Sequence, residues 1–170
     1  MIVFKEGSIF DSKAQTITNA VNCVGVMGKG LALDFKNRFP EMFTDYTRRC
    51  KNKEVALGRP YLYVTQELPW ILNFPTKDHW RNASNLQDII DGLEFLQKEY
   101  RNWGISSLAI PALGCGLGGL KWEVVARLLH DFSKNLEIPV EVYVPMNTSA
   151  STATSMFAKD NAGIREESGE

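Results

Sequence analysis

Side chains that form disulfides or bind transition metals are scarce in this chain of 170 residues. The only cysteines are Cys23, Cys50 and Cys115, an odd number at wide spacing, and the only histidines are His79 and His130. This pattern fits neither a disulfide framework nor a zinc site. We therefore expect reduced thiols and a chemistry that needs no metal and no cofactor.

Long apolar segments and an excess of either charge are also absent. No apolar run approaches the roughly 20 residues of a membrane-spanning helix, and the first residues lack the pattern of a secretory signal. The formal net charge of −1 is too small for a broad, non-specific grip on nucleic acid. With 44% hydrophobic and 23% charged residues, the composition is typical of a single folded domain, which we expect in the cytoplasm.

Glycine, by contrast, is concentrated in two short segments. Each follows a strand-like run and precedes a helix-like one: Gly25-Val-Met-Gly28-Lys-Gly30 and Gly114-Cys-Gly116-Leu-Gly118-Gly119. Glycine allows backbone N–H groups to approach an anion closely, and the helix that follows adds its positive N-terminal end. Glycines that merely close turns would look the same in either segment alone. Two such segments in one small domain indicate a phosphate-bearing ligand held between them.

Hydrophobic periodicity predicts alternating strands and helices. The predicted strands cover residues 2–4, 16–21, 61–66, 70–74, 107–110 and 140–144. The predicted helices cover residues 31–38, 42–51, 85–103, with Ser84 as a cap, and 122–133. Because the strands are apolar rather than alternating, we expect an α/β fold with a mostly parallel sheet covered by helices on both faces. Residues 148–170 are polar and small, which predicts a linker or tail at the edge of a longer protein.

Two common phosphate-binding motifs fit the glycine segments poorly. The second segment matches G-x-G-x-x-G, but no acidic residue ends the next predicted strand, and too few residues remain for a dinucleotide-binding fold. The first segment is not a Walker A motif, because Gly30 follows Lys29 where Ser or Thr is required and Cys23 replaces the opening glycine. A pyrophosphate with a sugar on either side, as in ADP-ribose, fits better.

Three segments together resemble the macrodomain family. Thr18-Asn-Ala-Val-Asn22 with the first glycine segment resembles the first half of the macrodomain signature, and the segment from Ile110 to Trp122 resembles its second phosphate loop. Asn73-Phe-Pro-Thr-Lys77 is similar to the branch that contains the terminal ADP-ribose glycohydrolase and the DarG antitoxins. The resemblance covers residues 1–147 and implies a three-layer α/β/α sandwich around a mixed six-stranded sheet.

The resemblance also implies roles for individual residues. Lys77 would be catalytic and Asn22 would bind the distal ribose, although an asparagine after a strand also commonly completes a turn. The other residues implied to contact ADP-ribose are Ser8, Ile9, Gly28, Lys29, Gly30, Leu31, Thr76, Gly114, Cys115, Gly116 and Leu117.

Two positions depart from the family pattern. Many macrodomains have an aspartate at the position of Ser8 that recognises the adenine amine, and the human terminal glycohydrolase has a catalytic aspartate at the position of Gly118. The second departure makes the chain more similar to DarG, which does without that acid.

The implied activity is that of an ADP-ribosyl glycohydrolase that frees DNA bases of ADP-ribose, as antitoxin to a DarT-type toxin. Lys77 would attack the anomeric carbon or trap the ring-opened aldehyde, which requires its neutral amine. His79, Trp80 and Arg81 would contact single-stranded DNA, although an aromatic residue there could equally be packing. The alternatives are a macrodomain that binds ADP-ribose without cleaving its conjugates, and a hydrolase of protein-linked ADP-ribose esters.

Overall fold

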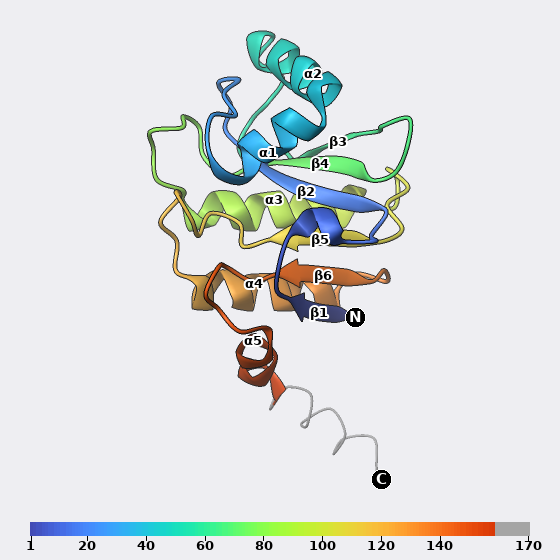
Figure 1. Ribbon diagram of the computed structural model, residues 1–170, viewed down its shortest axis with the longest axis vertical. Helices are drawn as coiled ribbons and strands as arrows, with labels where there is room; N and C mark the ends of the chain where they lie inside the picture. Colours follow the sequence, from blue (N-terminus) through green and yellow to red (C-terminus); the bar gives the residue numbers. More distant parts are fainter. Residues whose placement is uncertain (159–170) are drawn as a thin grey trace.

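A six-stranded β-sheet runs through the computed structural model, which describes residues 1–158 (Figure 1). The strands, in the order in which they lie in the sheet, are β1 (Ile2–Lys5), β6 (Val140–Tyr143), β5 (Leu108–Pro111), β2 (Thr16–Val21), β4 (Trp70–Pro75) and β3 (Tyr61–Tyr63). Neighbouring strands are parallel except for β3 and β4, which are antiparallel. The sheet is therefore mixed, as the resemblance implied.

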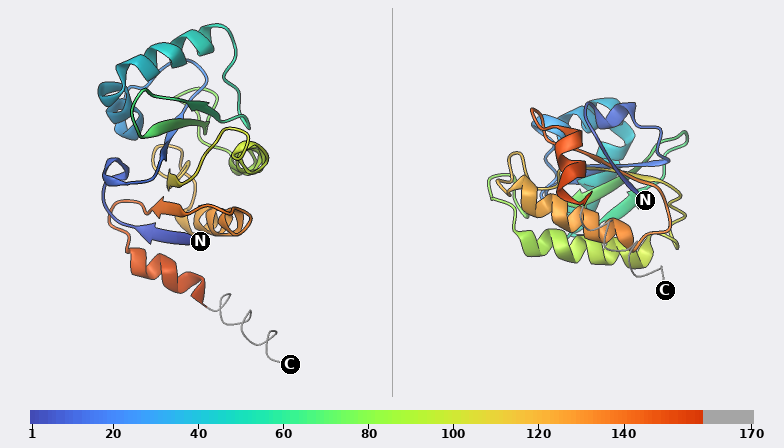
Figure 2. Two further views of the ribbon diagram at one scale, coloured as in Figure 1. Left: turned by 90° about the vertical axis from the view of Figure 1, so that its right-hand side faces the viewer. Right: turned by 90° about the horizontal axis from the view of Figure 1, so that it is seen from below.

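Helices cover both faces of the sheet (Figures 1 and 2). One face carries the 3-10 helix η1 (Ile9–Asp11), α1 (Gly30–Arg38) and α2 (Pro40–Lys51), and the other carries α3 (Leu86–Glu99) and α4 (Trp122–Lys134). Adjacent residues of β4 enter different cores: Ile71 packs with Phe35 of α1, and Leu72 belongs to the cluster that contains Leu129 of α4. Since successive strand side chains point to opposite faces, burial of both faces explains the continuously apolar strands. The three-layer α/β/α sandwich is confirmed.

Several boundaries differ from the sequence prediction. Helix α3 ends at Glu99, not at residue 103, because the chain turns and passes through Gly104 at a φ of +75°. The N-cap of α3 is Asn85, whose side chain accepts a backbone N–H, so the prediction of Ser84 as the cap is wrong. Strand β3 is also shorter than predicted and ends at Tyr63.

A further helix lies where the sequence predicted only a linker or tail. Helix α5 (Ala150–Met156) packs against β1, and Ala153 and Phe157 are buried. The ring of Phe157 stacks on those of Phe4 and His130, at centroid distances of 5.7 Å and 4.1 Å. Ala150 and Met156 also pack against the core, but small alanines in a run of Ser and Thr give a weak apolar signal, which is why the helix was missed. The structure thus corrects the tail predicted from residue 148, and residues 159–170 of that tail lie outside the described residues.

None of the helices within residues 1–158 is long and apolar enough to cross a membrane.

Candidate functional site

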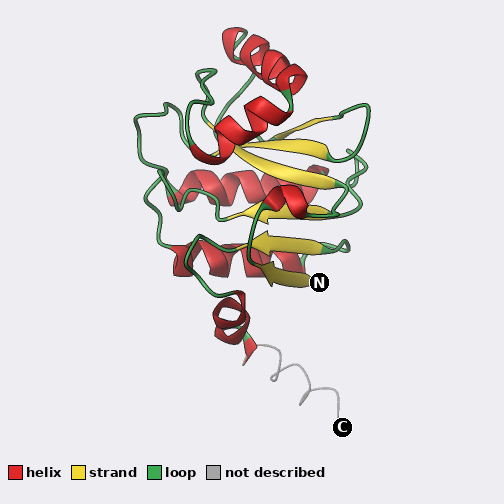
Figure 3. Cartoon of the chain, in the orientation of Figure 1, coloured by secondary structure: helices red, strands yellow, loops and turns green. Residues whose placement is uncertain are grey.

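The predicted motifs meet at the carboxyl-terminal edge of the parallel strands. Strands β5, β2 and β4 are neighbours, so the loops that follow them lie at one edge, on the left in Figures 1 and 3. We call these loops the first glycine loop (residues 22–29, after β2), the lysine segment (residues 76–84, after β4) and the second glycine loop (residues 112–121, after β5). Open α/β sheets bind their ligands at this edge.

Asn22 holds the first glycine loop in shape. Its Nδ2 donates to the carbonyl of Val26 at 2.7 Å, and its Oδ1 accepts from the backbone N–H groups of Val24 and Val26. The hydroxyl of Tyr46, on α2, lies 2.8 Å from both the Oδ1 and the carbonyl oxygen of Asn22. These bonds support the interpretation of Asn22 as a turn residue and leave one Nδ2 hydrogen for the predicted contact with ribose. Nothing in the sequence pattern identified Tyr46 as its partner.

The first glycine loop leads directly into the N-terminus of α1. Lys29 is the N-cap residue and makes no side-chain cap bond, and Gly30 begins the helix at a φ of +55°. Gly28, Lys29 and Gly30 are exposed. The first N–H groups of an α-helix have no partner within the helix, so the chain around Leu31 offers the uncapped helix end that an anion requires.

Backbone bonds tie the lysine segment to the first glycine loop on both sides of Lys77. The N–H of Thr76 donates to the carbonyl of Val21 at 2.9 Å, and the N–H of Cys23 donates to the carbonyl of Asp78 at 3.0 Å. Lys77 is partly exposed, and among the described residues no carboxylate forms an ion pair with its amine. The lysine therefore lies beside the Asn22 turn, and its catalytic role stays a prediction.

The turn after Lys77 displays an aromatic and basic cluster. The N–H of Arg81 donates to Nδ1 of His79 at 3.1 Å, and the rings of His79 and Trp80 lie 5.1 Å apart. The guanidinium of Arg81 lies 4.6 Å from the centre of a Trp80 ring. Because Trp80 is 45% exposed, its indole is not part of the core, which favours a contact role over packing.

Backbone bonds and close packing shape the second glycine loop. The N–H of Leu120 donates to the carbonyl of Gly114 at 2.9 Å, and the N–H of Gly119 donates to that of Gly116 at 3.2 Å. Gly114 has a φ of +73°, which glycine tolerates. A Cβ on Gly116 would meet no atom within 4 Å, and Leu117 is 71% exposed. This part of the loop is therefore open to a ligand.

Gly118, in contrast, is enclosed. A Cβ at this position would lie 2.3 Å from Oγ of Ser84 and 2.5 Å from the carbonyl oxygen of Gly114. No side chain fits there without moving the loop. The position at which the resemblance led us to look for an aspartate is closed to any carboxylate.

Ser8 and Ile9 lie after β1, at the same edge of the sheet. The Oγ of Ser8 accepts the N–H of Phe10 and caps η1, while the side chain of Ile9 packs in the core. Ser8 also lines a cavity of about 460 Å³, whose other wall includes Val144 and Asn147. Ser8 is thus placed beside a hollow large enough for part of a ligand, and Ile9 can offer only its backbone.

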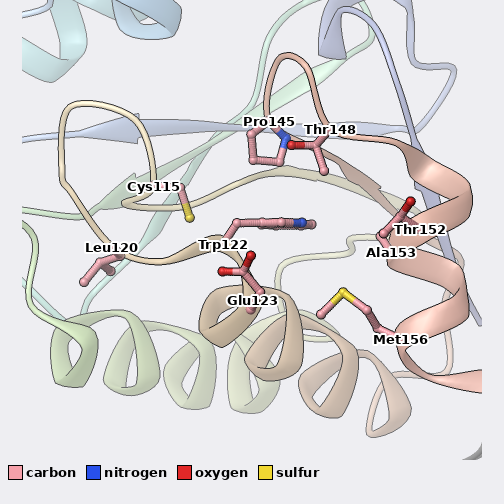
Figure 4. Close-up of a pocket in the computed structure, with 9 residues that line it drawn as sticks. All are labelled: Cys115, Leu120, Trp122, Glu123, Pro145, Thr148, Thr152, Ala153 and Met156. Atoms are coloured by element: carbon pink, nitrogen blue, oxygen red, sulfur yellow. The ribbon is translucent and has the colours of Figure 1, made fainter.

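A separate cavity of about 280 Å³ lies between the second glycine loop, α4 and α5 (Figure 4). The side chain of Cys115 lines it, with Trp122, Glu123 and Thr152. Lys77 does not line it, so this hollow is not the predicted reaction centre. Cys115 directs its thiol into this cavity, and its backbone N–H donates to the carbonyl of Ala112 at 3.1 Å.

Each glycine loop carries one thiol with a raised pKa. Burial, with a smaller contribution from Asp78, raises the pKa of the Cys23 thiol to about 11. Burial and, to a smaller extent, Glu123 raise the pKa of the Cys115 thiol to about 11 as well. Neither thiol has the lowered pKa of a nucleophilic cysteine. Within residues 1–158, no group of three or more His, Cys, Asp and Glu side chains is arranged to hold a metal ion.

Comparison with known families decides the classification. Residues 18–129 match the Macro domain family. The chain belongs to the macrodomain family. Its sequence is 43% identical over 159 residues to a DNA ADP-ribosyl transferase–DNA ADP-ribosyl glycohydrolase fusion protein of Thermosipho africanus, covering 83% of this chain and 41% of that protein. It is 44% identical over 153 residues to a DNA ADP-ribosyl glycohydrolase of Mycobacterium tuberculosis, covering 88% of this chain and 44% of that protein. The macrodomain thus spans less than half the length of these two relatives.

Solved structures agree with this classification. The macrodomain of Mycobacterium tuberculosis DarG is similar with a TM-score of 0.81 and 44% identity, over 85% of this chain and 98% of that one. Thermosipho africanus DarTG in complex with ADP-ribose also has a TM-score of 0.81, at 42% identity, over 86% of this chain and 43% of that one. The human ADP-ribose glycohydrolase is more distant, at 26% identity over 147 residues, covering 84% of this chain and 90% of that protein.

The macrodomain fold places the predicted ligand-binding residues on the loops that follow β1, β2, β4 and β5 and in the first turn of α1, all at one edge of the sheet. Their individual contacts with ADP-ribose stay predictions. Sequence reasoning missed Tyr46 and Ser84, because each acts through a partner that is distant along the chain.

Proposed function

We propose that this macrodomain is an ADP-ribosyl glycohydrolase that removes ADP-ribose from modified DNA bases in the cytoplasm, as the antitoxin to a DarT-type toxin. The observation that carries the proposal is the placement of Lys77, a partly exposed amine without an ion-pair partner among the described residues. The segment that carries it is bonded to the first glycine loop at Cys23 and to the second at Gly118, and the exposed backbone of both loops suits a pyrophosphate. The names of the relatives at 43% and 44% identity indicate DNA as the carrier of ADP-ribose.

In the proposed reaction, the neutral amine of Lys77 attacks the anomeric carbon of the distal ribose. A bond forms between Nζ and this carbon while the bond from the carbon to the base breaks. The base leaves with the bonding electron pair and takes up the proton that the lysine loses. Water then adds to the same carbon, and the amine leaves with the bonding electron pair and takes up the proton that the water loses. Free ADP-ribose and the unmodified base are the products, and the neutral lysine is regenerated.

The two glycine loops would supply binding and orientation. N–H groups at the start of α1 and those of Gly114, Gly116 and Leu117 would donate to the pyrophosphate from opposite sides, and Asn22 would offer its remaining Nδ2 hydrogen to the ribose. The cavity beside Ser8 would take the adenine end. With a side chain excluded at Gly118, Lys77 would act without an acidic partner from that loop.

The cluster of His79, Trp80 and Arg81 would hold the DNA next to the reacting base. An exposed indole can stack on an unpaired base, which is worth about 1–3 kcal/mol per base, and the guanidinium of Arg81 can pair with a phosphate. A single-stranded or extruded base is required, because the linkage cannot reach Lys77 from within a duplex.

The test measures ADP-ribose release from two substrates: single-stranded DNA with an ADP-ribosylated base, and ADP-ribosylated protein. Release from DNA is expected for the native macrodomain and for Lys98→Ala, a matched lysine control on α3. Lys77→Ala should abolish release while its affinity for ADP-ribose stays within a few-fold. Trp80→Ala should weaken binding of the modified DNA about 10-fold without changing the affinity for free ADP-ribose.

Other outcomes point to the alternatives. Full activity of Lys77→Ala would exclude the lysine mechanism. Release from protein alone would indicate a hydrolase of ADP-ribose esters. Tight binding of ADP-ribose without release from either substrate would indicate a non-catalytic binding domain.

A further inference from the structure

Ser84 lies where the lysine segment meets the second glycine loop. Its backbone N–H donates to the carbonyl of Gly118 at 2.9 Å, and the residue is only 8% exposed. Its side chain fills the space beside two glycines: a Cβ on Gly118 would lie 2.3 Å from Oγ of Ser84, and a Cβ on Gly114 would lie 3.2 Å from Cβ of Ser84. The serine thus occupies the volume into which a side chain at position 114 or 118 would project.

The opposite end of the lysine segment is bonded just as firmly. Thr76 donates to the carbonyl of Val21, and Asp78 accepts from the N–H of Cys23. Residues 76–84 therefore bridge the two glycine loops, with Lys77 near one end of the bridge and Ser84 at the other. A change in the contact between Ser84 and Gly118 acts on the same segment that carries the lysine.

The hydroxyl of Ser84 does not explain why the residue is there. Its Oγ is buried and has no hydrogen-bond partner among the residues that the structure describes. A buried, unsatisfied hydroxyl destabilises the folded state, so the useful features of Ser84 are its small volume and its backbone N–H. The small side chain and the N–H group together allow the carbonyl oxygen of Gly118 to lie 2.9 Å from the backbone nitrogen of Ser84.

We propose that Ser84 is a positioning residue that locks the second glycine loop onto the lysine segment, so that the pyrophosphate-binding loop and Lys77 form one rigid unit. The proposal rests on the proposed function only for the identity of the ligand and the role of Lys77. The mechanical coupling itself can be tested on the protein without a ligand. Misplacement of a positioning group by about 1 Å is enough to lower activity by orders of magnitude.

The test enlarges the side chain at position 84. Ser84→Val adds methyl groups where the contact with Gly118 is already close, and should push the second glycine loop away. Without ligand, hydrogen exchange should rise at the amides of residues 112–121 and also at the Cys23 amide bonded to Asp78. With ligand, the dissociation constant for ADP-ribose should rise about 10-fold or more. Ser84→Ala keeps the small volume and the backbone N–H. Its hydrogen exchange and its dissociation constant for ADP-ribose should equal those of the native protein.

Two further variants keep the test decisive. Gly118→Ala adds a methyl group to the same contact from the side of the second glycine loop. It should raise hydrogen exchange in residues 112–121 and at the Cys23 amide, which provides a second measurement if Ser84→Val does not fold. Ser133→Val on α4 is the matched control, a buried serine whose Oγ donates to the carbonyl of Leu129. It should lower stability without changing exchange at Cys23 or in residues 112–121.

The outcomes separate this proposal from the proposed function. Exchange that rises only in residues 112–121, and not at Cys23, would overturn the coupling, as would unchanged exchange in both Ser84→Val and Gly118→Ala. Failure of the native protein to bind ADP-ribose or to release it from DNA would overturn the proposed function and leave the exchange result standing.

Discussion

The two glycine loops reach the same edge of the sheet by different physical means. Side-chain bonds shape the first loop, through the amide of Asn22 and the hydroxyl of Tyr46. Backbone bonds and the absence of side chains shape the second, where Gly114 and Gly118 leave no room for a Cβ. In the first loop, a Cβ on Gly25 would meet only ordinary contacts, the nearest at 3.6 Å. A glycine-rich segment can thus require its glycines for backbone conformation in one loop and for space in another.

Gly114→Ala should have the largest effect on the second loop. The new Cβ would lie 2.7 Å from Cδ1 of Leu120 and 3.2 Å from Cβ of Ser84, at a φ of +73°. The left-handed conformation and the overpacking together should lower the free energy of unfolding by about 3 kcal/mol, measured by urea denaturation. Gly116→Ala has open space and should change it by less than about 1 kcal/mol. Equal losses in the two variants would contradict a loop built on close packing at Gly114.

The two loops also differ from the unfolded chain in the reactivity of their thiols, of which each loop has one. With pKa values of about 11 against 9.0 for an ordinary thiol, Cys23 and Cys115 should be alkylated by iodoacetamide at pH 8 about 100-fold more slowly than in the unfolded chain. Mass spectrometry of each labelled cysteine measures both rates. Because the folded state raises these pKa values, stability should also fall as the pH rises above about 9, where the unfolded thiols lose their protons first. Fast labelling of either cysteine at pH 8 would show that its loop opens.

A smaller effect is expected where side-chain bonds dominate. Tyr46→Phe removes the hydroxyl that contacts Asn22 and should lower the free energy of unfolding by about 1–2 kcal/mol, measured by the same denaturation. Tyr63→Phe is the control, since the hydroxyl of Tyr63 has no hydrogen-bond partner among the described residues, and it should cost less than about 0.5 kcal/mol. If both variants cost the same, Tyr46 does not support the first loop through its hydroxyl.

Much of the fold could be predicted because its signals are local. Continuous apolar strands and amphipathic helices indicated the parallel sheet with two covered faces, and the predicted range of β2 agrees with the structure. Helix α5 escaped prediction because Ala150 and Ala153, two of the positions that pack against the core, are small and lie in a run of Ser and Thr, so their apolar signal is weak. The end of α3 was misplaced because the turn at Gly104, rather than the hydrophobic pattern, ends the helix.

In the candidate site, too, local features could be predicted and contacts between distant residues could not. Both glycine segments and Lys77 could be identified from residue type, order and resemblance, since each lies directly after a predicted strand. The supporting contacts could not, because Tyr46 reaches Asn22 from another helix and Ser84 reaches Gly118 across two loops. Residue type also says nothing of the closed space at Gly118, which depends on where Ser84 is held.

The family, the order of the strands and of helices α1 to α4, and the positions of the two glycine segments could be predicted from the sequence. Those properties depend on periodicity and on short motifs that neighbouring residues share. Which atoms remain free for a ligand depends on the tertiary structure. Hydrogen bonds occupy all but one donor of the Asn22 amide, the thiol of Cys115 faces a separate cavity, and Gly118 admits no side chain. Hydrogen-bond saturation and excluded volume arise from residues far apart in the chain, so they exist only once the chain has folded.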